Sequence, residues 1–199
     1  MKKLFFATGN QGKVKELVSL IAPYDVEILT MKDFPAFEAP EETGTTFQEN
    51  AYIKAKAAVD YSGIPALADD SGITVDALKG APGVYSARYS GENATSESNN
   101  QKLLDAMRDV PVGQRQAQFR ASLALVFPDG RKFFSEGVIE GELLFEYRGD
   151  GGFGYDPLFY LESYGKTTAE LTMEEKNKIS HRGRAFKDIV KQMVDVGEL

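Results

Sequence analysis

The alternation of apolar side chains between residues 119 and 127 constrains the fold of this 199-residue chain more than any other feature. Apolar residues at every second position give an extended strand one apolar face; they are Phe119, Ala121, Leu123, Leu125 and Phe127. Residues 128–130, Pro-Asp-Gly, are typical of a turn, and residues 132–139 are expected to return as the hairpin partner. Residues 142–147 predict one more strand. The centre of the chain therefore predicts a β-hairpin.

Helices are predicted on both sides of this hairpin. Residues 46–49 and 172–175 have the pattern of a capping box, which predicts one helix to about Tyr61 and a short one that reaches His181. Helical spacing predicts further helices at 13–22, 96–108 and 183–196, and short strands are expected at 3–7, 26–30 and 66–68. Residues 33–44, 79–93 and 149–157 are expected to be loops. The order of these elements predicts an α/β protein with a mixed sheet and helices on its faces.

Composition excludes several classes of function. The chain has 23 Lys and Arg against 30 Asp and Glu, a net charge of −7, which argues against a broad electrostatic grip on nucleic acid. With no cysteine and one histidine, the chain cannot build thiol catalysis, a zinc–thiolate site or a multi-histidine metal site. The apolar run at 4–7 is too short for a signal peptide, and no stretch approaches the ~18 residues of a membrane helix. We therefore expect a cytoplasmic protein with no membrane association.

A glycine-containing turn at Thr8–Lys13 separates the first strand from the first helix. Backbone N–H groups at a helix N-terminus bind phosphate, glycine lets the ligand approach, and Lys13 adds a positive charge. A routine turn with a solvated lysine explains the same residues equally well. The segment is not a Walker A loop, because its spacing is too short and no Ser or Thr follows Lys13.

Residues 149–154 match the G-x-G-x-x-G pattern of dinucleotide-binding proteins. That pattern must open a helix, whereas here Pro157 and the aromatic residues around it predict a strand. The dinucleotide interpretation is therefore rejected. What remains is a loop that presents Phe153, Tyr155 and Asp156, which suits a planar heterocycle, or a bulge whose Phe153 packs inward.

Asp69-Asp70-Ser71-Gly72 follows a short apolar strand. Adjacent strand residues point to opposite faces, so the two carboxylates are expected to have different roles. Carboxylate oxygens suit Mg²⁺, which completes its shell with substrate phosphates, and Glu41 and Glu42 offer further oxygens. An Asx-type turn after the strand is the alternative. An aspartic protease is disfavoured, because it needs two such signatures and an all-β fold.

Positive charge is concentrated at residues 176–184 of this acidic chain. A solvated helix face explains it, and a lone histidine is more often structural than catalytic. His181 beside Arg182 also offers directed donors to an oxygen acceptor.

Taken together, these segments closely resemble the inosine triphosphate pyrophosphatase family, also called the dITP/XTP pyrophosphatases. The matching stretches are Thr8–Lys13, residues 41–44 with 47–51 and 54–55, residues 68–72, residues 80–83 with 85–88, residues 152–157, and residues 170–182. They occur in order along almost the whole chain, which makes the resemblance highly specific.

The resemblance implies one nucleoside-triphosphate pyrophosphatase domain over residues 1–199, with a long mixed sheet and a cleft between two lobes. It implies a homodimer and Mg²⁺-dependent hydrolysis of ITP, dITP and XTP to the monophosphate and pyrophosphate. By position, Asp70 is implied as the proton acceptor and Glu41 with Asp70 as the metal ligands. The implied substrate contacts are Thr8, Gly9, Asn10, Gln11, Gly12, Lys13, Lys54, Ser71, Phe153, Gly154, Tyr155, Asp156, Lys176, His181 and Arg182. A nucleotide-binding module without turnover is the alternative, although the carboxylates present favour the enzyme.

Overall fold

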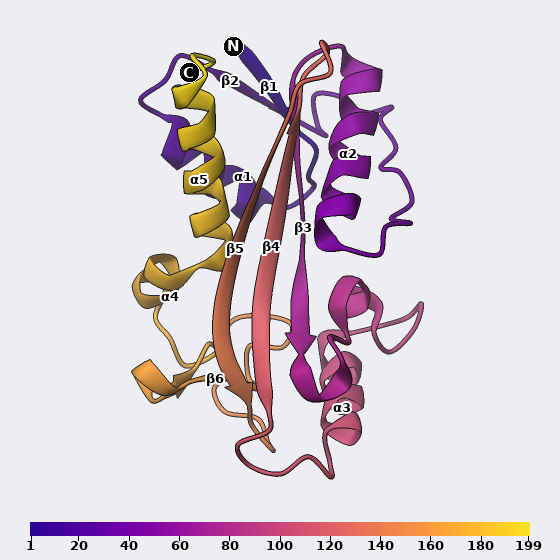
Figure 1. Ribbon diagram of the computed structural model, residues 1–199, viewed down its shortest axis with the longest axis vertical. Helices are drawn as coiled ribbons and strands as arrows, with labels where there is room; N and C mark the ends of the chain where they lie inside the picture. Colours follow the sequence, from indigo (N-terminus) through magenta and orange to yellow (C-terminus); the bar gives the residue numbers. More distant parts are fainter. The chain divides into compact units, whose positions relative to one another are not determined.

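The computed structural model describes the backbone of all 199 residues and every side chain except those of Met173 and Asn177. Its strands are β1 (Lys3–Phe6), β2 (Glu27–Thr30), β3 (Ala66–Val75), β4 (Gln116–Val126), β5 (Lys132–Leu143), β6 (Phe159–Leu161) and β7 (Lys166–Thr167). Its α-helices are α1 (Gln11–Ile21), α2 (Phe47–Ser62), α3 (Ser96–Ala106), α4 (Met173–Ile179) and α5 (His181–Asp195), as Figure 1 shows. Among the described residues, no helix combines the length and apolar character needed to cross a membrane.

The strands form one mixed sheet of seven strands in the order β2-β1-β3-β4-β5-β6-β7. β1 runs parallel to both β2 and β3, with Phe5 opposite Leu29 and Ala66. β6 runs antiparallel to β5 and to β7. The predicted fold class, a mixed sheet flanked by helices, is confirmed.

The chain divides into two compact units, and three strands continue from one unit into the other. Unit 1 comprises residues 1–70, 121–137 and 182–199, and unit 2 comprises residues 71–120 and 138–181. The divisions at 70/71, 120/121 and 137/138 fall within β3, β4 and β5.

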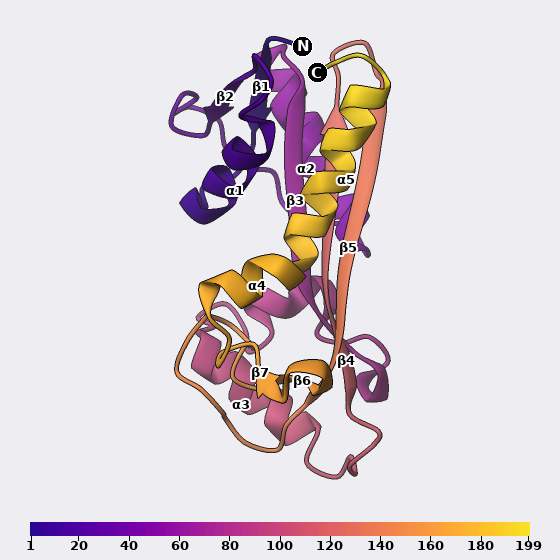
Figure 2. The same cartoon turned by 90° about the vertical axis from the view of Figure 1, so that its left-hand side faces the viewer.

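Unit 1 buries apolar residues on both faces of its part of the sheet. Leu4 and Phe6 of β1 pack in one cluster with residues of α1 and α5, whereas Phe5 packs in another with residues of α2. The same alternation continues in β4, where Leu123 belongs to the first cluster and Ala124 to the second. Figures 1 and 2 show α2 and α5 on opposite sides of β3. The period of two along each strand therefore decides which helix each side chain meets.

Unit 2 has its own apolar core, which includes Ile73 and Leu158, and a buried arginine beside it. Arg115 is only 3% exposed, and its guanidinium donates to four backbone carbonyls, those of Met107, Val110, Leu143 and Leu144. Burial lowers the pKa of this guanidinium. Because every one of these acceptors is a main-chain oxygen, Arg115 ties the end of α3 to the strand region of the same unit.

Both predicted capping boxes are present. Thr46 accepts a hydrogen bond from the N–H of Glu49, whose carboxylate accepts one from the N–H of Thr46, and Thr172 and Glu175 repeat the arrangement. The predicted starts of two helices are wrong by two residues. α1 begins at Gln11 rather than 13, because the Asn10 side chain caps it by accepting from the backbone N–H groups of Gly12 and Lys13. α5 begins at His181 rather than 183.

The strand predicted at 66–68 is in fact ten residues long and continues through the aspartates to Val75. The Asx-turn interpretation of Asp70 is therefore wrong. Ile73 and Val75 are fully buried in unit 2, and Asp69 and Asp70 each have a lysine partner, so packing and charge pairing override the local turn preference.

Two further strand predictions need correction. Residues 142–147 do not form a separate strand: Glu142 and Leu143 complete β5 by pairing with Tyr160 and Phe159, and the strand ends there. Residues 155–158 form turns rather than strand, because β6 begins only at Phe159. The loop predicted at 79–93 contains the 3₁₀ segment Gly83–Arg88.

Candidate active site

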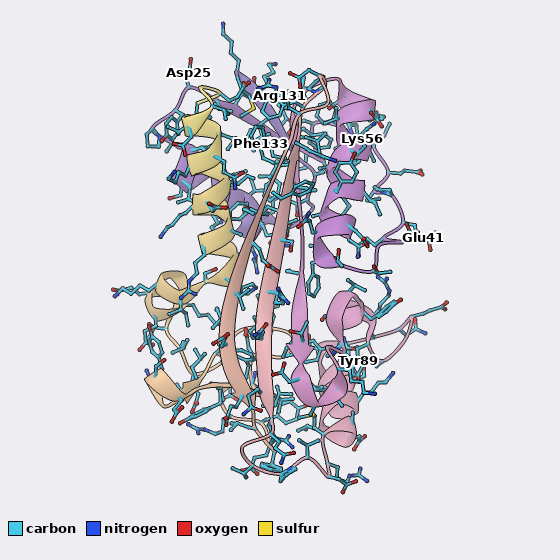
Figure 3. All side chains as sticks on the ribbon, viewed as in Figure 1. Asp25, Glu41, Lys56, Tyr89, Arg131 and Phe133 are labelled. Atoms are coloured by element: carbon cyan, nitrogen blue, oxygen red, sulfur yellow. The ribbon has the colours of Figure 1, made fainter. Side chains whose placement is uncertain are left out.

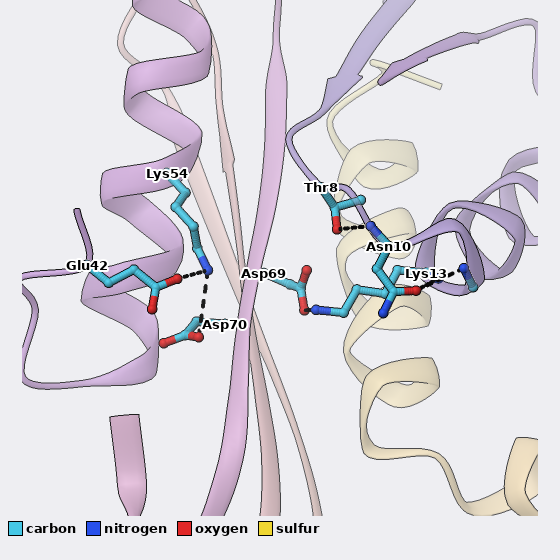
Figure 4. Close-up of polar contacts among 8 residues, drawn as sticks. Thr8, Asn10, Lys13, Glu42, Lys54, Asp69 and Asp70 are labelled. Carbon is cyan, nitrogen blue, oxygen red and sulfur yellow. Dashed lines mark hydrogen bonds and ion pairs between the residues drawn. The ribbon is translucent and has the colours of Figure 1, made fainter. Parts of the chain in front are cut away.

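Within unit 1, β3 presents its two aspartates to different partners, as the alternation predicted (Figure 4). The Lys13 Nζ lies 2.5 Å from Asp69 Oδ2. The Lys54 Nζ lies 3.7 Å from Asp70 Oδ1, and the Asn50 amide donates to Asp70 Oδ2 at 3.1 Å. Each carboxylate therefore has its own lysine, and the two can serve separate roles.

The surroundings of Asp70 come from α2 and from the acidic loop before it. Asn50 and Lys54 are four residues apart on α2, so they lie on one face of that helix. Lys54 also donates to Glu42 Oε1 at 2.7 Å. The Asp70 and Lys54 side chains are 12% and 15% exposed, so water still reaches them. A carboxylate held in place by an amide and a lysine, yet accessible to water, can accept a proton from that water.

The acidic loop presents its two glutamates differently. Glu42 is bonded to Lys54, whereas the Glu41 side chain is exposed and lies on the outer side of the loop beside α2 (Figure 3). The structure thus brings Glu42, and not Glu41, to Asp70 through Lys54. Among the described residues, no group of three or more Asp, Glu or His side chains is arranged around a common cation position. The oxygen donors of Asp70 and this loop still fit Mg²⁺, which uses one or two carboxylates together with substrate phosphates and water.

The Thr8–Lys13 turn is fixed by its own side chains. Asn10 Oδ1 accepts from the N–H groups of Gly12 and Lys13 at 2.9 and 3.2 Å, and Thr8 Oγ1 accepts from the Asn10 N–H at 3.2 Å. Gly9, Gln11 and Gly12 are exposed. Lys13 is only 18% exposed and bonds Asp69, so the alternative of a solvated lysine is wrong.

Two more charged residues of unit 1, Glu16 and Arg182, belong to the surroundings of Asp69 and Lys13. Burial raises the pKa of the Glu16 carboxyl, the nearby charge of Asp69 acts in the same direction, and Arg182 and Lys13 oppose it. The Arg182 Nε is buried and has no hydrogen-bond partner among the described residues. Arg182 therefore acts on the same Glu16 carboxyl as Asp69 and Lys13 do, and it retains an unused donor.

Within unit 2, Asp156 organises the glycine-rich loop. Its Oδ2 accepts from the Phe153 N–H at 2.9 Å and from Lys176 Nζ at 2.7 Å, and its Oδ1 accepts from the Thr168 hydroxyl at 2.8 Å. Gly152 has a φ of 77°, and a Cβ there would collide with Asp156 and Lys176. The Phe153 ring is 71% exposed, so the alternative of an inward-packed phenylalanine is wrong.

The remaining predicted residues lie in different surroundings. Tyr155 is 6% exposed, donates its hydroxyl to the Ser86 carbonyl at 2.7 Å, and has a raised pKa because it is buried. The His181 ring stacks on Phe119 with centroids 5.6 Å apart. Ser71 follows Asp70 in β3 and lies on the Asp69 face by alternation. Tyr155 is therefore a core anchor of the loop that carries its exposed neighbour Phe153.

Sequence reasoning did not single out Asn50, Glu16 or Thr168 as functional. Asn50 carries a local signal, because it precedes Lys54 by one helical turn. Thr168 carries none, since its partner Asp156 meets it only in the folded unit. Glu16 follows Lys13 by one helical turn, but the other charges that act on it, Arg182 and Asp69, are distant in sequence.

Comparison with known proteins agrees with this fold. The family model described as "Ham1 family" matches residues 4–192. A dITP/XTP pyrophosphatase from Desulforamulus reducens is 54% identical over 185 residues, which is 93% of this chain and 92% of the relative. A protein of the same name from Escherichia coli K12 is 51% identical over 189 residues, 94% of this chain and 95% of the relative.

Solved structures give the same result. A HAM1 protein from Coxiella burnetii superposes with a TM-score of 0.93 at 42% identity, covering 98% of this chain and all (100%) of that one. The Ham1 protein from Staphylococcus aureus has a TM-score of 0.90 at 38% identity, with 100% of both chains covered. The family model and the full-length relatives lead to one conclusion: this chain belongs to the Ham1 family.

Proposed function

We propose that the chain hydrolyses purine nucleoside triphosphates with non-standard bases, namely ITP, dITP and XTP, to the nucleoside monophosphate and pyrophosphate. By removing such nucleotides it would cleanse the nucleotide pool. Two of its full-length relatives at 51–54% identity carry the name dITP/XTP pyrophosphatase. The observation that carries the proposal is the arrangement at Asp70, a partly accessible carboxylate held by Asn50 and Lys54.

In the proposed reaction, Asp70 accepts a proton from the attacking water. A new bond forms between the water oxygen and the α-phosphorus. The bond from that phosphorus to the bridging oxygen breaks, and its electron pair leaves with pyrophosphate. Phosphoryl transfer of this kind depends on positioning and on neutralising charge, so no covalent nucleophile is required.

The lysines of unit 1 supply part of that neutralisation. We assign Lys54 and the Thr8–Lys13 segment to the phosphates, with Lys13 oriented by Asp69 at 2.5 Å. Mg²⁺, when bound, would supply further positive charge to the phosphate oxygens. Asp70 and the acidic loop, with Glu41 as the residue implied by resemblance, would hold it.

We assign recognition of the base to Phe153, Asp156, Lys176, His181 and Arg182. Phe153 offers an exposed ring for stacking, and Asp156 and Lys176 form an ion pair at 2.7 Å beside it. Inosine and xanthine present an acceptor oxygen at position 6 and an N1–H donor, whereas adenine presents the reverse. A site matched to the first pattern leaves buried groups unpaired with adenine and therefore rejects it. Ser71, Gly154 and Tyr155 complete the proposed substrate contacts.

The test is the product analysis of ITP incubated with the protein and Mg²⁺. We expect IMP and pyrophosphate as primary products and no turnover after chelation of the metal. IDP and orthophosphate as primary products would contradict the scissile bond. Binding of ITP without turnover would identify the chain as a nucleotide-binding module instead.

Two further proposals concern the setting of the enzyme. We propose that it acts as a homodimer and in the cytoplasm, with a small-molecule nucleotide as its ligand rather than nucleic acid. The net charge of −7 supports the last point, because nucleic acid binding depends on positive surface charge.

A further inference from the structure

We infer that Ser96 and Asn100 of α3 are positioning residues that hold Phe153 where a purine base can stack on it. The inference rests on the proposed function and adds to it two residues that position Phe153. Neither residue needs to touch the nucleotide, because both act through the backbone of Gly154.

The two side chains bind both polar groups of one loop residue. The Gly154 N–H donates to Ser96 Oγ at 3.3 Å, and the Asn100 amide Nδ2 donates to the Gly154 carbonyl at 2.8 Å. Ser96 and Asn100 are four residues apart on α3 and so lie on one face of the helix. Gly154 follows Phe153 directly, so fixing its backbone fixes the point from which the Phe153 ring projects.

At the tip of the loop, polar bonds from α3 to Gly154 add to the anchor that the buried Tyr155 provides one residue further on. Residues 151–154 and α3 line an open pocket of about 470 Å³, which also includes Tyr147 and Asp150. Gly154 has a φ of 60°, and a Cβ built on it would meet no atom within 4 Å. Because the loop has space beside it and an exposed ring at its tip, losing the bonds from α3 would let it shift into that space.

The burial of Asn100 supports a specific task for its donor. The residue is 3% exposed, yet its Oδ1 has no hydrogen-bond partner among the described residues. The neighbouring Asn99 uses both ends of its amide, accepting from the Ser90 N–H and donating to two carbonyls. Burying the Asn100 Oδ1 without a partner is unfavourable. The favourable polar contact of this side chain is therefore the hydrogen bond from its Nδ2 to the Gly154 carbonyl.

The experiment compares three variants of the full chain. Asn100→Leu keeps the approximate volume and removes the donor, and Ser96→Ala removes the weaker, exposed contact. Leu103→Ala is the control for lost stability, because Leu103 is fully buried on the same helix and its apolar side chain packs in the core of unit 2, which includes Tyr155, without hydrogen-bonding the loop. For each variant we would measure kcat and KM for ITP, the inhibition constant of inorganic tripolyphosphate, and hydrogen exchange of the amides at 153–156.

We expect Asn100→Leu to raise KM for ITP about tenfold, within the range of base–aromatic stacking, and to leave kcat and tripolyphosphate inhibition nearly unchanged. Ser96→Ala should act in the same direction by a smaller factor, and both should speed exchange at 153–156. Leu103→Ala should lower stability without this selective change. Equal changes for ITP and tripolyphosphate, or an unchanged KM in both loop variants, would overturn the inference. If the parent does not hydrolyse ITP, the proposed function fails, and unchanged exchange in both loop variants would then overturn the positioning role separately.

Discussion

The two aspartates of β3 form a natural pair for substitution, because they are adjacent in sequence and bonded to different lysines. Asp70→Asn removes the proposed proton acceptor while keeping its shape, so we expect the rate to fall about 10²-fold or more. Asp69→Asn removes the partner of Lys13, 2.5 Å away, and should cost less, mainly through KM. Steady-state kinetics on folded variants checks this. Near-normal turnover by Asp70→Asn would remove Asp70 from the mechanism.

Glu41 and Glu42 allow a second comparison, because one is exposed and the other is bonded to Lys54. Glu41 forms no hydrogen bond or ion pair among the described residues, so its oxygens remain available to a cation, whereas Glu42 is neutralised by Lys54 at 2.7 Å. We expect Glu41→Gln to raise the Mg²⁺ concentration needed for half-maximal rate. Glu42→Gln should instead raise KM by releasing Lys54. Titrations of rate against Mg²⁺ at saturating ITP separate the two, and the reverse pattern would assign the metal to Glu42.

The orientation of site residues could be predicted where it follows from their spacing along one strand or helix. Contacts with residues distant in sequence could not be predicted. Alternation correctly separated Asp69 from Asp70, and residues 149–157 were expected to form a loop with Phe153 exposed as one of two alternatives, which is the one found; its role as a site for a planar ligand stays a prediction. The pairing of Asp69 with Lys13 joins residues 56 positions apart, and that of Asn100 with Gly154 joins residues 54 apart. No local pattern encodes such contacts, because they depend on how the folded elements pack.

At the scale of elements, the capping box of α2 links helix stability to pH. Hydrogen bonds from the backbone N–H and then the hydroxyl of Thr45 lower the pKa of Glu49 below 4.5. A carboxyl whose pKa is lower in the folded than in the unfolded protein stabilises the fold at every pH above the unfolded-state pKa. This contribution is lost as the pH falls through the folded-state pKa. We therefore expect Glu49→Gln to destabilise the protein at pH 7, and the difference from the parent to shrink as the pH falls below about 4.5.

Urea unfolding of the parent and Glu49→Gln between pH 7 and pH 3 measures this difference. Glu92→Gln is the control, because Glu92 is exposed in a turn outside any helix. A Glu49→Gln difference that stays constant over this range would show that the carboxylate charge has no part in the cap.

Strand ends were less predictable than helix starts at this scale. The capping boxes of α2 and α4 are local chemistry and were located correctly from the sequence. β3 continues through Asp69-Asp70-Ser71 because distant lysines neutralise the carboxylates and because Ile73 and Val75 enter the core of unit 2. β5 ends where its pairing with β6 ends, which depends on a strand 16 residues further on (159 − 143).

For the whole molecule, the class of fold followed from the sequence, but the order of the strands did not. Strands, capped helices and the central hairpin were enough to indicate a mixed sheet with helices on its faces. The placement of β1 between β2 and β3, and of β6 beside β5, depends on pairing between distant segments. The division into two units with separate cores also left no mark in the composition along the chain.

The proposed homodimer is a property of the whole molecule and can be tested directly. Among the described residues, ten large apolar side chains are exposed and six of these belong to unit 2. Apart from Phe153, which is assigned to the base, they are Tyr85, Val112, Phe145, Tyr147 and Tyr164. Aromatic side chains are enriched at protein interfaces, so unit 2 has the surface composition that a second copy could cover. We expect light scattering to give about twice the chain mass of 21.9 kDa at micromolar concentration. A mass of 21.9 kDa that persists at every concentration in an active preparation would show that the enzyme works as a monomer.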